Sequence, residues 1–118
     1  MTLYIKDNIV ALATPPGYGA LAVVRISGGD LEPLFKKLTS IKKIKPRHAY
    51  LSKIKSSKGK VIDSVLITLF KTPKSFTGED VVEISCHGGQ VISALLIEEL
   101  VLLGCRPALA GEFSKRAY

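Results

Sequence analysis

Apolar and polar positions alternate along much of this chain with a period of two, the repeat of a half-buried β-strand. Strands bounded by glycine, proline and other turn residues are predicted at residues 8–14, 20–27, 47–54, 61–70, 81–86 and 105–110. The polar segment "KSSKG" at 55–59 joins the third strand to the fourth. "PPGYG" at 15–19 predicts a tight turn between the first two strands.

A first helix is predicted from Asp30, which is placed to cap it, to about Leu38. Its apolar face is made by Leu31, Leu34, Phe35 and Leu38. Pattern and capping therefore agree on a helix that lies with one side on a core.

A second helix, from about Gln90 to Leu103, is apolar nearly all round and is predicted to be buried on more than one side. Its polar exceptions are Ser93, Glu98 and Glu99. Gly104 follows at the position where glycine commonly ends helices. "GEFSKRAY" at 111–118 begins a third helix.

This mixture of strands and helices predicts the α+β (mixed α/β) class, with one main mixed sheet and flanking helices. The length of 118 residues, 47% apolar and 23% charged, suits a single domain over residues 1–118 with its own core. A third helix that is also the last segment of the chain suggests a fragment of a longer protein.

Two otherwise apolar strands each carry one strong ionic group. In "VVEISC", Glu83 points away from the apolar face formed by Val82, Ile84 and Cys86. In "LAVVRIS", Arg25 points away from the apolar face formed by Ala22, Val24 and Ile26. A charge in such a setting needs a partner. Arg25 and Glu83 are predicted either to pair with each other or to serve a ligand that has both donor and acceptor groups.

The formal net charge is +7, and it is unevenly distributed. Residues 36–60, here called the basic window, contain ten Lys or Arg and no acidic residue. A lysine-rich hairpin that keeps the domain in solution is one interpretation, which the predominance of lysine over arginine favours. A module that binds RNA through residues Lys36 to Lys60 is the alternative.

Other chemical motifs carry little weight. "GYGALA" at 17–22 matches a dinucleotide fingerprint, but a strand follows it where the motif requires a helix. Cys86 and His87 are neighbours on a strand and point to opposite faces, so they do not form a nucleophile–base dyad. Cys86 and Cys105 are expected to be reduced and buried. No cysteine or histidine spacing resembles a metal site, and no catalytic residue is assigned.

The N-terminal segment lacks the pattern of a secretory signal. The longest apolar run, near residues 94–103, is interrupted by two glutamates and is too short to cross a bilayer. We therefore expect a cytoplasmic protein that does not associate with a membrane.

Three blocks together resemble a known family. "DNIVALATPPGYGALAVVRISG", "SFTGEDVVEISCHGG" and "GEFSKRAY" are similar, in order and spacing, to the N-terminal domain of the tRNA modification GTPases called MnmE or TrmE. The resemblance covers the whole chain. It implies a fold similar to the folate-binding domains of glycine-cleavage T-proteins, dimerisation, and binding of a reduced one-carbon folate (formyl- or methylene-tetrahydrofolate).

The resemblance also implies a longer protein with a helical domain and a G domain, which would hold GTP, magnesium and potassium. Such a protein would act with the flavoprotein MnmG (GidA) on the wobble uridine of tRNA. The folate contacts of the family that fall on this chain are Arg25 and Glu83. A third contact, a lysine, would lie beyond Tyr118. The chain departs from the family pattern at Tyr18, where a basic residue is usual, and at Ala110, where proline is usual.

Overall fold

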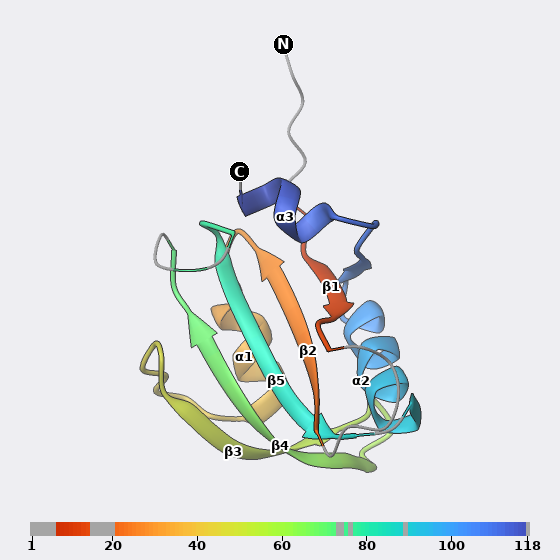
Figure 1. The fold of residues 1–118 in the computed structure, drawn as a ribbon. Helices are drawn as coiled ribbons and strands as arrows, with labels where there is room; N and C mark the ends of the chain where they lie inside the picture. Colours follow the sequence, from red (N-terminus) through yellow and green to blue (C-terminus); the bar gives the residue numbers. More distant parts are fainter. Residues whose placement is uncertain (1–6, 15–20, 73–74, 76, 89, 118) are drawn as a thin grey trace.

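The described residues form a six-stranded sheet and three helices (Figure 1). The structure is a computed structural model, and it describes residues 7–14, 21–72, 75, 77–88 and 90–117. The strands lie in the order β3-β4-β5-β2-β1-β6. Their bounds are β1 Ile9–Leu12, β2 Leu21–Gly28, β3 Ala49–Lys55, β4 Val61–Phe70, β5 Asp80–His87 and β6 Arg106–Pro107.

The sheet is mixed, as the sequence predicted. β6 runs parallel to β1, and the other neighbouring strands are antiparallel. The two central strands, β5 and β2, are separated in sequence by α1 and the β3–β4 hairpin. The predicted class, α+β with one main mixed sheet, is confirmed.

Helices α1 (Glu32–Thr39) and α2 (Gln90–Leu102) cover one face of the sheet (Figure 1). The core between these helices and the sheet consists of apolar side chains, whose burial stabilises the fold. Among its fully buried members are Val24, Ile26, Phe35, Ile84, Val82 and Leu100. Among the described residues, no helix lies over the centre of the opposite face (Figure 1).

The first helix begins slightly later than predicted. Its N-cap is Leu31, which makes no side-chain cap bond, so the assignment of the N-cap to Asp30 was wrong. Asp30 still accepts a hydrogen bond from the backbone N–H of Glu32 at 3.3 Å. The predicted apolar face is confirmed, since its four members are at most 7% exposed.

The prediction that α2 is buried on more than one side was wrong. One side of α2 lies on the sheet, and that side includes the polar residues Ser93 and Glu99. Large apolar side chains on the outside are exposed, among them Val91 (70%) and Leu102 (68%). Because α2 is apolar nearly all round, its composition does not indicate which side turns inward.

α3 (Glu112–Ala117) lies across the end of the sheet beside β1 (Figure 1). Gly104, with φ of 103°, ends α2 as predicted and turns the chain toward β6. The predicted turn at 15–19 and the departure at Tyr18 lie outside the described residues. Over the part of the chain that is described, no helix has the length and hydropathy needed to cross a membrane.

Candidate functional site

Arg25 and Glu83 lie side by side on the open face of the sheet. Strand register places Arg25 on β2 directly opposite Glu83 on β5. The same row continues to Ala11 on β1 and to Thr68 on β4. Opposed residues share a face, so this row points away from the helices. The sequence predicted the outward direction of both charges correctly.

The two side chains form an ion pair. Arg25 donates from Nε at 2.9 Å and from Nη2 at 2.6 Å, both to Oε2 of Glu83. Glu83 Oε1 receives neither of these bonds. The side chains are 31% and 29% exposed, so the pair is half-buried and water reaches it. Of the two predicted alternatives, the structure shows the pairing of Arg25 with Glu83; the ligand-binding role stays a prediction.

Arg25 of this pair lines a cavity of about 360 Å³, whereas Glu83 does not line it. Arg25 forms one wall, Ala11 of β1 and Ala13 just after β1 form another, and residues 108–114 close it from the side of α3. Small-molecule sites occupy roughly 300–1,000 Å³, so the cavity falls at the lower end of that range. Ala110, one of the two departures from the family pattern, lines this cavity.

The wall formed by residues 108–114 is held by a network of five charged side chains. Arg106 bonds Asp7 and Glu112, each at 2.5 Å. Arg116 bonds Asp7 at 2.6 Å and Glu79 at 3.0 Å. The hydrogen bond from Arg106 is the main cause that lowers the pKa of Asp7 and the pKa of Glu112 to about 2 each.

Cys86 and His87 lie on opposite faces, as predicted. Cys86 is 1% exposed in the core, and burial raises its pKa. His87 is exposed and pairs with Asp63 of β4, with Nδ1 at 2.7 Å from Oδ1. Cys86 and Cys105 are both buried free thiols. His87 therefore belongs to a cross-strand hydrogen-bonded pair rather than to a dyad with the thiol.

Sequence reasoning missed two buried carboxylates. Asp80, fully buried, accepts hydrogen bonds from the backbone of Leu31 and Thr72 and from Lys71. Extending the apolar period of β5 by two residues would have placed Asp80 on the core face. Glu99, 7% exposed on α2, was noted as polar, but its inward direction was not predicted.

Fold and site define a class: a small mixed-sheet domain whose open face holds a paired arginine and glutamate beside a cavity sized for a small molecule. Residues 8–118 match the family model described as "GTP-binding protein TrmE N-terminus", and the chain belongs to that family. This confirms the resemblance seen in the sequence.

Similar proteins are named tRNA modification GTPase MnmE. The chain is 48% identical to the protein of Campylobacter jejuni over 96% of its own length and 26% of that protein. It is 46% identical to the protein of Aliarcobacter butzleri, over 98% of its length and 26% of that protein. It is 44% identical to the protein of Helicobacter pylori, over 99% of its own length and 25% of that protein. The chain thus spans about a quarter of these relatives.

Proposed function

We propose that this chain binds a reduced one-carbon tetrahydrofolate at the Arg25–Glu83 pair, as the non-catalytic N-terminal domain of a tRNA modification GTPase. The observation that carries the proposal is the position of Arg25, paired with Glu83, beside a cavity and on a sheet face whose centre none of the described helices covers. Membership of the family supports the tRNA modification role.

The chemistry of the pair suits a folate. A reduced pterin presents a ring N–H beside an exocyclic amino group, and a carboxylate such as Glu83 accepts from both. The guanidinium of Arg25 matches a carboxylate of the folate tail or the pterin carbonyl. A half-exposed pair is worth about 0–1 kcal/mol, so a ligand replaces it at small cost.

The test is calorimetric titration with 5-formyltetrahydrofolate. Hydrogen bonds to charged groups contribute about 1.5–3 kcal/mol, so Arg25→Ala and Glu83→Ala should each weaken binding by roughly 10- to 100-fold. Asp63→Ala is the control, because it breaks the His87–Asp63 cross-strand pair, which does not line this cavity. Unchanged affinity in both Arg25 and Glu83 variants would show that the pair is structural.

The wider role follows from the family. We propose that the full-length protein hydrolyses GTP in its G domain with magnesium and potassium. It would act with MnmG and tRNA to modify the wobble uridine, with the folate as the one-carbon donor. The names of the similar proteins support the GTPase and tRNA parts of this role.

We further propose that the domain forms a homodimer through the open face of the sheet. Register places Leu21, Leu51 and Leu66 on this face, at 58%, 75% and 46% exposure. Exposed apolar side chains grouped on one face are typical of protein interfaces. In such a dimer the Arg25–Glu83 pair of each copy would lie on the face that is turned toward the partner.

A further inference from the structure

Glu99 of α2 is a buried carboxylate that lacks a partner. The residue is 7% exposed. Among the residues that the structure describes, none forms a hydrogen bond or an ion pair with its carboxylate. A buried charge is costly unless it is paired, so a carboxylate in this state requires an explanation.

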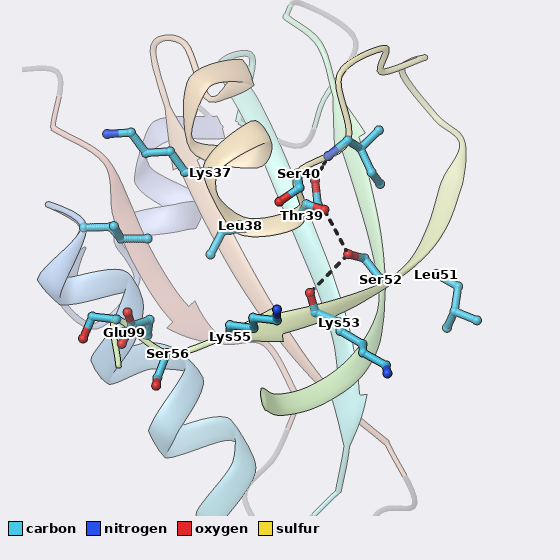
Figure 2. A pocket seen from close by; sticks show the side chains of 13 residues that line it. Lys37, Leu38, Thr39, Ser40, Leu51, Ser52, Lys53, Lys55, Ser56 and Glu99 are labelled. Atoms are coloured by element: carbon cyan, nitrogen blue, oxygen red, sulfur yellow. Dashed lines mark hydrogen bonds between the residues drawn. The ribbon is translucent and has the colours of Figure 1, made fainter. Parts of the chain in front are cut away.

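The helical repeat determines where this carboxylate lies. Leu95, Glu99 and Leu102 follow at i, i+4 and i+7 and therefore share one stripe of α2. This stripe borders residues 56–60, the loop that joins β3 to β4. Figure 2 shows Glu99 beside Ser56 of that loop. The fold thus places the carboxylate in the space between the helix and the hairpin.

That space is a cavity of about 370 Å³, within the range of small-molecule sites. Its apolar lining consists of Val61, Ile62, Leu95 and Leu102. Three of these large side chains are open to water, at 51% exposure for Val61, 44% for Leu95 and 68% for Leu102. A ligand that covered them would gain the free energy of burying apolar surface.

The loop that forms one wall of the cavity is held by its own hydrogen bonds. The Ser56 N–H donates to the Lys60 carbonyl at 2.7 Å, and the Gly59 N–H donates to the Ser56 carbonyl at 2.9 Å. The Lys58 N–H lies 3.3 Å from Ser56 Oγ. Gly59 has φ of 81°, a conformation that glycine adopts without strain. This wall is therefore formed before any ligand arrives.

Glu99 also lines a neighbouring cavity of about 690 Å³, and five exposed lysines line one or the other of the two: Lys37, Lys53, Lys55, Lys58 and Lys60. Lys37 and Lys53 point apart (Figure 2), and none of the five pairs with Glu99. Charges in water are screened, whereas a buried charge acts through a medium of lower dielectric constant. Glu99 therefore determines the sign of the group that fits beside it.

We propose that the cavity between α2 and the β3–β4 loop binds a small organic cation. The ligand is an amine or amidine whose charged end donates to Glu99 and whose apolar body lies against Ile62, Leu95 and Leu102. No residue lines both this cavity and the cavity beside Arg25. The inference goes beyond the proposed function and does not rest on it.

The test titrates 2-phenylethylamine into the 118-residue chain and follows the backbone amide signals by NMR. Saturable shifts are expected at residues 56–60 and 95–102. Glu99→Gln keeps the shape but removes the charge-assisted hydrogen bond, so binding should weaken roughly tenfold or more. Glu98→Gln is the matched control, because Glu98 is an exposed neighbour that lines the same cavity, and it should change affinity by less than about threefold.

Three related probes decide which parts of the site act. The neutral 2-phenylethanol and the small cation methylammonium should each bind at least about tenfold more weakly than the amine. Equal affinity for the alcohol would overturn the role of Glu99, and equal affinity for methylammonium would overturn the role of the apolar walls. Tighter binding of 3-phenylpropionate would show that the lysines govern the cavity and would overturn the proposal, as would equal losses in Glu98→Gln and Glu99→Gln.

The stability of Glu99→Gln gives a second measurement that needs no ligand. Because an unpaired buried charge is removed, the urea midpoint should be unchanged or higher. A clear fall would show that the carboxylate already has a partner within the protein and would overturn the site. The affinity of this variant for 5-formyltetrahydrofolate should not change, so failure here is distinct from failure of the Arg25–Glu83 proposal.

Discussion

Asp80 connects three segments through one side chain. Its Oδ2 accepts from the Leu31 N–H at 3.1 Å and from Lys71 Nζ at 3.3 Å, while Oδ1 accepts from the Thr72 N–H at 3.0 Å. A buried carboxylate is tolerated only with such partners. The start of α1 and the end of β4 are therefore fixed to the first residue of β5, the strand that carries Glu83.

Replacing Asp80 should lower the stability of the folded domain. Asp80→Ala leaves the two backbone N–H groups of Leu31 and Thr72 without acceptors, and we expect a loss of about 3 kcal/mol in the free energy of unfolding. Urea denaturation gives this value from the midpoint and slope. Asp30→Ala is the matched control, because Asp30 also contacts the start of α1 but is exposed; it should cost about 1 kcal/mol or less. Equal costs would contradict the role given to Asp80.

The alternation within each strand predicts on which face of the sheet Arg25 and Glu83 lie, but not which residues they contact. The period of two placed Arg25 and Glu83 opposite the apolar faces of their own strands, and the structure agrees. Their pairing depends on β2 lying next to β5, and 58 residues separate the two side chains. Such adjacency is a property of topology, which local patterns do not encode.

At the scale of elements, α3 is unusual because none of its residues is buried. Six residues are too few for a helix to be stable by propensity alone. Charged contacts hold it instead: Arg106 binds Glu112 at the helix start, and Arg116 near its end binds Asp7 and Glu79. These contacts join segments up to 109 residues apart, so no local pattern of the sequence indicates them.

The ion pairs that fix α3 to the rest of the domain should weaken in acid. The pKa values of Asp7 and Glu112 are lowered to about 2 from ordinary values of 3.8 and 4.5, chiefly by hydrogen bonds from Arg106. In the unfolded chain these groups bind protons at higher pH than in the folded protein. Their contribution to stability is therefore complete above about pH 5 and disappears as the pH falls toward 2.

The urea midpoint of the wild type, measured between pH 6 and about pH 2, should fall steadily over this window. Arg106→Gln should be less stable at pH 6 and should show a shallower fall, because the pKa values of the two carboxylates move back toward their ordinary values. Lys60→Gln removes a positive charge from an exposed residue outside the network and should follow the wild-type curve. A parallel fall of the urea midpoint in wild type and Arg106→Gln would show that this network does not cause the loss of stability in acid.

α2 marks the limit of prediction from composition. Its ends were predicted to within one residue, because Gly104 and the residues before Gln90 are clear boundary signals. Its orientation was not, because nearly every position is apolar and the buried side is selected by the sheet beneath it. The two cavities beside the β3–β4 hairpin depend on that orientation, since Glu99 turns inward and lines both of them.

At the scale of the whole molecule, the two faces of the sheet differ in what covers them. One face is covered by α1 and α2 and supplies the core. The other carries the Arg25–Glu83 pair at its centre and exposed leucines toward β3 and toward the start of β2. A sheet with one covered face leaves the second face available for a ligand and a partner. The isolated charges predicted a ligand as one of two alternatives, whereas the dimer was implied only by the family resemblance.

Substitutions on each face of the molecule test whether the proposed homodimer forms through the open face of the sheet. Leu51→Glu with Leu66→Glu places two like charges on the open face, and burying them in an interface is costly. We expect the wild type to sediment as a dimer and this variant to sediment as a monomer, with an unchanged circular dichroism spectrum. Val91→Glu is the matched control, because Val91 is an apolar residue of similar exposure, 70%, on α2. Dissociation by Val91→Glu, with a dimeric Leu51/Leu66 variant, would move the interface to the helical side, where the covered face of the sheet lies.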